Sequence, residues 1–215
     1  MKTVYLIPGL GADSRIYKKI IIDDAVVIKI DWIEPEPTDT LTSYAKNLID
    51  HYNIQVNSVV IGNSLGGMIA MEISKIIPLS KTILISSVKT KSETPAYFPV
   101  FKFIGLYKLA SVKFASRMKF LLSLVFGKMK GGEMRLFTDM IEKSSPKFIK
   151  WATKAVLDFD NQTIMPGTYT VIGDKDKVFN YRRIKDAIII PGGTHIMIFD
   201  KADQVNKILK GILTK

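Results

Sequence analysis

The sequence predicts an α/β fold, with a mostly parallel sheet of about six strands, helices on both faces of that sheet, and a helical insertion. Short apolar runs alternate with helical patterns over the first 90 residues, and the alternation returns near the C-terminus after a long segment without it. Each run is apolar throughout, as is typical of parallel strands covered on both faces. A chain of 215 residues buries roughly 70% of its extended surface, which is enough for one core.

The individual elements follow from β-branched runs and from the residues that begin or end them. A strand at 3–7 runs into Pro8-Gly9, and a helix at 68–77 is stopped by Pro78. Asp39 or Thr40 is placed to cap a helix at 41–52, whose apolar residues fall on one face. The predicted strands are 3–7, 25–30, 58–61, 81–86, 168–172 and 187–190, and the predicted core helices are 14–22, 41–52, 68–77 and 201–213.

Residues 91–165 show no convincing strand pattern and are rich in Phe, Lys, Leu and Met. Helices are predicted there near 98–110, 112–126, 133–143 and 146–159. We therefore divide the chain into an α/β core, formed by residues 1–90 and 166–215, and a helical insertion, formed by residues 91–165.

Composition excludes several kinds of chemistry. The chain has no cysteine, which rules out disulfide scaffolds, Cys-type zinc sites and thiol catalysis. His51 and His195 are the only histidines, which argues against a multi-histidine metal centre, and the chemistry predicted below needs no metal or organic cofactor. No run approaches the roughly 20 apolar residues of a membrane-spanning helix, and the N-terminal apolar run is too short for a signal peptide. We predict a soluble, cytoplasmic protein.

A G-x-S-x-G motif, Gly62-Asn63-Ser64-Leu65-Gly66, lies between an apolar strand and an apolar helix. This context is typical of a nucleophile elbow, in which a sharp turn exposes the serine hydroxyl. The helix N-terminus behind the turn offers free N–H groups to a developing anion. The alternative interpretation is an ordinary strand-to-helix turn that uses glycine for its geometry.

A serine hydroxyl needs a base that takes its proton. His195 follows the last apolar strand in Pro191-Gly192-Gly193-Thr194-His195, at the edge of a parallel sheet where ligands bind, whereas His51 is interpreted as an exposed residue near a helix end. The base in turn needs an acceptor. Asp174 and Asp176 both follow the strand at 168–172, and either could serve, with Asp176 preferred.

The chain order Ser64, Asp176, His195 resembles that of the α/β-hydrolase superfamily, in particular small bacterial-type serine hydrolases with a helical lid. Gly173-Asp174-Lys175-Asp176 resembles the family's G-x-x-D acid loop, which supports Asp176. Gly193-Thr194-His195 resembles its G-x-H loop. The resemblance implies that the backbone N–H groups of Leu10 and Leu65 form the oxyanion hole, and that residues 91–165 correspond to the lid.

The sequence also departs from the family pattern. Pro8 stands where the family's His-Gly-x loop has histidine, the two usual N-terminal strands have no counterpart, and the segment between Asp176 and His195 is short.

Residues 91–130 contain eight basic residues and one acid, Glu93, within a chain of net charge +11. Three interpretations are open. In the first, the helices predicted in this segment turn an apolar face to the active site and a Lys-rich face to solvent. In the second, the segment contacts an anionic lipid surface. In the third, its charge attracts an anionic substrate. No nucleic-acid partner is expected, because no recognisable binding module accompanies the charge.

These features together predict a serine hydrolase that cleaves a carboxylic ester, thioester or lactone with an apolar acyl part, through an acyl-enzyme on Ser64. One alternative is a C–C bond hydrolase or lyase on the same triad, with Asn63 beside the nucleophile. Another is a ligand-binding protein that keeps the hydrolase fold with little turnover. The oligomeric state does not follow from the sequence.

Overall fold

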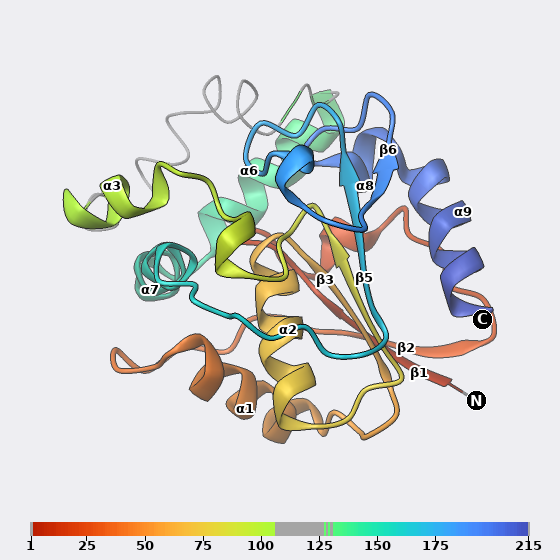
Figure 1. Cartoon of the computed structure of the whole chain (residues 1–215), viewed down its shortest axis with the longest axis horizontal. Coiled ribbons are helices and arrows are strands. Elements are labelled where there is room, and N and C mark those ends of the chain that lie inside the picture. The colour runs from red at the N-terminus through yellow and green to blue at the C-terminus, as the bar shows by residue number, and fades with distance from the viewer. Residues whose placement is uncertain (1, 106–126, 128, 130, 215) are drawn as a thin grey trace.

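The core of the molecule is a six-stranded sheet in the order β2-β1-β3-β4-β5-β6, and every neighbouring pair is parallel (Figure 1). The computed structural model describes residues 2–105, 127, 129 and 131–214. The strands are β1 Lys2–Ile7, β2 Ala25–Lys29, β3 Val59–Asn63, β4 Lys81–Ile85, β5 Thr168–Gly173 and β6 Ile188–Ile190. The predicted α/β fold with about six mostly parallel strands is thus confirmed.

Helices connect β2 to β3, β3 to β4 and β4 to β5, and two more follow β6. In the core they are α1 Leu41–Tyr52, α2 Leu65–Ile76, α8 Met197–Asp200 and α9 Ala202–Leu213. Between β4 and β5 they are α3 Phe98–Phe103, α6 Gly131–Lys143 and α7 Pro146–Leu157. Three short 3-10 turns complete the described elements, η1 Ser14–Tyr17, η2 Lys91–Glu93 and η4 Tyr181–Arg183.

The two faces of the sheet are covered by different helices. On one face, α1, α2 and α7 bury a cluster with Tyr5, Ile7 and Val60, and on the other, α6, α8 and α9 bury a cluster with Leu6 and Ile61. Burying one such side chain contributes about 1.5–3 kcal/mol relative to leaving it exposed. The insertion helices α6 and α7 therefore share the hydrophobic core of the sheet.

The first turn of α1 has the expected kind of cap. The Thr40 hydroxyl accepts a hydrogen bond from the Ser43 N–H at 3.1 Å, and the Ser43 hydroxyl accepts one from the Thr40 N–H at 3.0 Å. Of the two candidate caps, Thr40 thus satisfies the orphan N–H groups of the helix.

Strand β2 is less buried than the sequence predicted. Val26 and Val27 are 48% and 36% exposed, because β2 pairs only with β1 and forms an edge of the sheet. A continuous apolar run does not distinguish an edge strand from a central one.

Several helix limits also differ from the prediction. The helix expected at 14–22 is only the single turn η1, and α8 precedes the predicted C-terminal helix. The described part of the helix expected at 98–110 is α3, and the helix expected at 112–126 lies outside the described residues. None of the helices in the described residues is both long and apolar enough to cross a lipid bilayer.

Helix α2 begins at Leu65, three residues earlier than predicted, because packing overrides the low helix propensity of glycine. A Cβ atom on Gly66 would lie 2.3 Å from the Ile7 carbonyl oxygen and 2.4 Å from the Pro8 oxygen. Only glycine lets the first turn of α2 approach the end of β1 this closely.

Replacing Gly66 with alanine is therefore expected to lower the free energy of unfolding by about 3 kcal/mol or more, since a rigid backbone contact cannot relax. The matched control is Gly211→Ala. Gly211 is exposed in α9, and a Cβ atom on it would meet no other atom within 4 Å, so alanine is expected to raise the free energy of unfolding by about 0.5–1 kcal/mol. Urea denaturation measures both, and equal midpoints for the two variants would contradict this packing.

Candidate active site

Ser64 occupies a strained turn between β3 and α2. Its backbone has φ +52° and ψ −116°, outside the regions that residues with a side chain normally adopt. A Cβ atom on Gly62 would lie 2.1 Å from the Gly66 carbonyl oxygen, so the turn requires glycine there. The Ser87 hydroxyl donates to the Ser64 carbonyl oxygen at 2.7 Å. The Ser64 side chain makes no capping bond to α2, which leaves its hydroxyl directed elsewhere.

The structure brings Ser64, His195 and Asp176 together. The His195 Nε2 lies 3.0 Å from the Ser64 Oγ, and its Nδ1 lies 2.9 Å from the Asp176 Oδ2. Both the imidazole and the carboxylate are buried. With the proton on Nδ1 donated to Asp176, the Nε2 lone pair faces the serine hydroxyl, and this is the tautomer that can accept its proton.

Backbone N–H groups hold the Asp176 carboxylate in place. Its Oδ1 accepts hydrogen bonds from Val178 N–H at 2.8 Å and Phe179 N–H at 2.9 Å. The Phe179 ring also packs beside the His195 imidazole, with centroids 5.5 Å apart. Because Oδ1 is occupied in this way, Oδ2 is left to face the imidazole.

The two alternatives that the sequence left open are placed elsewhere. The Asp174 Oδ1 accepts a hydrogen bond from the Gly192 N–H at 2.6 Å, so Asp176 and not Asp174 contacts His195. His51 is exposed on α1, where its ring contacts Tyr52. Within the described chain, no group of three or more His, Asp or Glu side chains is placed to hold a metal ion.

Leu10 and Leu65 flank the serine. Leu65 is the first residue of α2, where backbone N–H groups have no partner inside the helix. Leu10 lies in the loop after β1, and its neighbour Gly9 packs so closely that a Cβ atom would lie 3.3 Å from the Ser64 Cβ. Leu10 also lines the cavity that contains Ser64, so both residues lie close to the serine.

A small cavity of about 40 Å³ opens beside the Ser64 hydroxyl. Its walls are mostly apolar and include Phe137 of α6, a residue that the sequence analysis did not single out. The described lining residues are Gly9, Leu10, Ala12, Ile16, Asn63, Ser64, Phe137, His195 and Ile196. As bounded by the described residues, the cavity has room for a small apolar group next to the hydroxyl.

Two polar groups, the buried Tyr17 and the more exposed Asp200, support this edge of the sheet. The Tyr17 hydroxyl donates to the Ile7 carbonyl oxygen at 2.6 Å, and burial raises the pKa of this tyrosine, which therefore stays a neutral donor. The Asp200 Oδ2 accepts a hydrogen bond from the Thr194 hydroxyl at 2.8 Å, and burial raises the pKa of the Asp200 carboxyl. Thr194 directly precedes His195.

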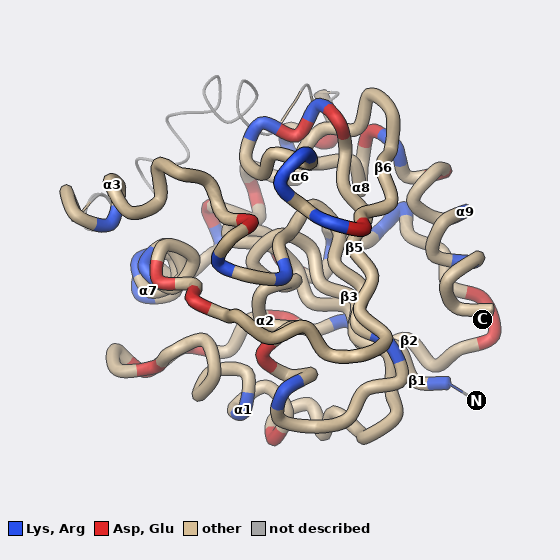
Figure 2. The backbone as a smooth tube through the Cα atoms, in the orientation of Figure 1, with Lys and Arg blue, Asp and Glu red and all other residues tan. Residues whose placement is uncertain are grey.

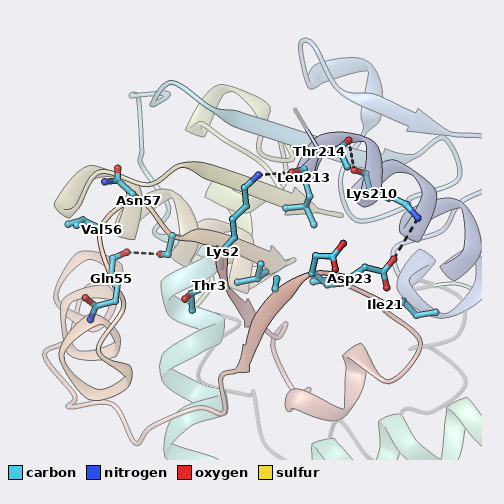
Figure 3. A pocket seen from close by; sticks show the side chains of 15 residues that line it. Lys2, Thr3, Ile21, Asp23, Gln55, Val56, Asn57, Lys210, Leu213 and Thr214 are labelled. Carbon is cyan, nitrogen blue, oxygen red and sulfur yellow. Dashed lines mark hydrogen bonds and ion pairs between the residues drawn. The ribbon is translucent and has the colours of Figure 1, made fainter.

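A larger cavity, of about 670 Å³, lies at the opposite edge of the sheet, where the strands begin (Figure 3). Lys2 and Lys210 line it, but Lys2 Nζ donates to the Leu213 carbonyl oxygen at 2.8 Å and Lys210 pairs with Asp23 at 3.7 Å. Its position excludes this cavity from the chemistry of Ser64, which lies at the end of β3.

Comparisons with known proteins agree with this fold. The model of the family described as "Alpha/beta hydrolase family" matches residues 4–208. No curated protein matches the chain significantly.

Several solved structures share the fold. A thermophilic esterase from Thermogutta terrifontis superposes with a TM-score of 0.76 at 16% identity, covering 100% of this chain and 90% of that chain. An esterase from Exiguobacterium antarcticum gives 0.75 at 17% identity, covering 100% and 92%. A bromoperoxidase from Bacillus anthracis gives 0.74 at 18% identity, covering 100% and 92%.

At such low identities these similarities establish the fold alone. The family match is different in kind, because it rests on the sequence and extends over nearly the whole chain. The chain belongs to the alpha/beta hydrolase family.

Proposed function

We propose that the protein is a serine hydrolase that cleaves a carboxylic ester, thioester or lactone through an acyl-enzyme on Ser64. The observation that carries the proposal is the continuous hydrogen-bonded relay from the Ser64 Oγ through His195 to Asp176. Membership of the alpha/beta hydrolase family supports it, as do the esterases among the proteins of similar structure.

The proposed mechanism follows from the geometry. As the Ser64 Oγ attacks the carbonyl carbon, the His195 Nε2 takes the hydroxyl proton, and Asp176 stabilises the resulting imidazolium. The N–H groups of Leu10 and Leu65 hold the oxyanion, and losing one such donor costs about 3 kcal/mol of transition-state stabilisation. His195 then protonates the leaving group, and water, deprotonated by the same imidazole, releases the acid and regenerates the serine.

We further propose that residues 91–165 act as the lid over a core of residues 1–90 and 166–215. The support is the position of α6, which brings Phe137 to the cavity beside Ser64. The size and lining of this cavity favour an ester with a small, apolar acyl group. The cytoplasmic location stays a prediction.

Contact with an anionic lipid surface through the basic segment also stays a prediction. Apolar side chains of α3 and its flank support it, since Val100, Phe103 and Ile104 are 57%, 92% and 61% exposed. Figure 2, by contrast, shows the Lys and Arg of the described chain spread among acidic residues over many elements. Salt-sensitive co-sedimentation with anionic vesicles checks the prediction, and absence of binding at low salt would exclude it.

The same site admits a second reaction class. Asn63 lines the cavity next to Ser64, and its amide donates to the Ile85 carbonyl oxygen at 3.2 Å. This position beside the nucleophile supports a C–C bond hydrolase or lyase on the same triad. A ligand-binding protein with little turnover would also retain the relay.

Reaction with a fluorophosphonate, followed by hydrolysis of p-nitrophenyl esters of increasing chain length, separates these functions.

We expect wild-type protein, but not Ser64→Ala, to form a fluorophosphonate adduct and to hydrolyse p-nitrophenyl acetate. Labelling without ester turnover would favour the C–C hydrolase or the binding protein. Folded wild-type protein that does not react would exclude a nucleophilic role for Ser64.

Asp176→Asn is expected to lower kcat on the order of 10³- to 10⁴-fold, because an amide does not enforce the productive imidazole tautomer or stabilise its cation. His51→Ala is the control, and its kcat should match that of wild type. Steady-state kinetics with p-nitrophenyl acetate measures both. A comparable loss in a folded His51→Ala protein would contradict the role proposed for His195.

Phe137→Ala is expected to shift the chain-length preference toward longer acyl groups. Removing the ring enlarges the cavity by the volume of several methylene groups. Each methylene of the acyl chain that the enlarged cavity accommodates is expected to raise kcat/KM for the longer ester, relative to the shorter one, by about 10-fold or more. The matched control is Met140→Ala, a second buried residue of α6 that is absent from the described lining of the cavity. A change in hexanoate-to-acetate preference that is equal in both variants would show that general loosening, not the wall at Phe137, is responsible.

A further inference from the structure

We propose that Asp174 is a positioning residue that fixes the loop carrying His195 against the loop carrying Asp176. The inference rests on the proposed function for its catalytic readout, but the structural clamp can be tested without turnover. It assigns a role to the carboxylate that does not contact the imidazole.

The clamp joins two loops at the carboxyl edge of the sheet. Asp174 is the first residue after β5, and its Oδ1 accepts the Gly192 N–H at 2.6 Å. Gly192 belongs to the loop that leads from β6 to His195. Two backbone hydrogen bonds accompany this contact, from Asp174 N–H to the Ile190 oxygen at 3.3 Å and from Lys175 N–H to the Gly193 oxygen at 2.9 Å.

The two loops are closely packed against each other. A Cβ atom on Gly173 would lie 2.0 Å from the Gly193 carbonyl oxygen, so the backbones are in direct contact. Gly192 has φ +71°, a left-handed conformation that glycine adopts readily. The turn at 190–193 is closed by a hydrogen bond from the Gly193 N–H to the Ile190 oxygen at 3.1 Å, and the Asp174 carboxylate adds an acceptor for the Gly192 N–H from the neighbouring loop.

Thr194 gives the loop a second attachment. Its hydroxyl donates to the Asp200 Oδ2 at 2.8 Å, so the loop is fixed on the His195 side by α8 and on the β6 side by Asp174. If the Asp174–Gly192 bond is lost, the Thr194–Asp200 bond remains, and the reverse is also true. We therefore expect the loop to stay folded while the position of the His195 imidazole becomes less well defined. The Nε2 must stay within hydrogen-bond reach of the Ser64 Oγ, and a displacement of about 1 Å can cost about 100-fold in rate.

The two aspartates differ in what they must supply. Asp176 faces an imidazole that becomes positively charged, so its negative charge is required. Asp174 faces a neutral backbone N–H and needs only an acceptor oxygen, which an asparagine side chain also offers. Asparagine is therefore expected to be tolerated at position 174 and not at position 176.

The kinetic test compares Asp174→Ala and Asp174→Asn with wild type in p-nitrophenyl acetate hydrolysis. We expect Asp174→Ala to lower kcat on the order of 10- to 100-fold with little change in KM, and Asp174→Asn to recover most of that loss. Asp50→Ala, which makes the same change at an exposed position of α1, is the matched control and should behave as wild type. The pH profile of kcat/KM should keep its wild-type shape in Asp174→Asn.

The structural test is hydrogen exchange of the Gly192 amide, followed by NMR, which requires no substrate. Protection should be lost in Asp174→Ala and kept in Asp174→Asn and Asp50→Ala. If the alanine variant does not fold, Asp174→Asn still tests the proposal. Its side chain keeps an acceptor oxygen, so protection of the Gly192 amide and most of the activity should be retained.

The outcomes are distinct. Wild-type kcat and wild-type protection at Gly192 in Asp174→Ala would overturn the proposal, and so would an Asp174→Asn protein as impaired as Asp176→Asn. If wild-type protein hydrolyses no ester, the proposed function fails, and the exchange of the Gly192 amide still decides whether the clamp exists.

Discussion

The 3.0 Å contact between the Ser64 Oγ and the His195 Nε2 joins residues that are 131 positions apart in the chain, and the parallel sheet is what makes it possible. Because all six strands run in the same direction, the segments that follow β1, β3, β5 and β6 all emerge at one edge. Each segment carries one of the residues that meet there: Leu10, Ser64, Asp176 and His195. Short loops then suffice to bring the last three within hydrogen-bond distance of one another.

The contact also requires strain, and the surrounding packing has to offset it. A serine at φ +52° costs on the order of 1–3 kcal/mol. The Ser87 hydroxyl holds the Ser64 carbonyl, and Gly62 and Gly66 allow backbone contacts that no side chain would permit. The cost is modest beside the burial of β1, β3 and α2 in the clusters of the core, so the fold tolerates a strained residue where its hydroxyl has to project.

Local patterns were enough to predict the strands, the motif around Ser64 and the two other members of the relay, because each has a signature in neighbouring residues. The exposure of β2, the wall at Phe137 and the Asp174–Gly192 bond have no such signature. Each depends on which segments meet in space. Strand β2 has one neighbouring strand instead of two, and α6 reaches the cavity from the insertion. The partner of the Asp174 carboxylate is a backbone N–H group, and a backbone group cannot be recognised as a partner from residue types. Position after the strand left both Asp174 and Asp176 open, the G-x-x-D resemblance favoured Asp176, and the contact of its carboxylate with His195 agrees with that preference.

The packing of α6 against the sheet limits how far this helix can move. Phe137, Met140 and Ile141 are 5%, 1% and 4% exposed, and they belong to the same buried cluster as the sheet residues. Pulling α6 away would return these side chains to water at a cost of about 1.5–3 kcal/mol each, a large part of the roughly 5–15 kcal/mol that stabilises a typical domain. Helix α6 is therefore held in place by the core, and Phe137 stays part of the wall of the cavity beside Ser64.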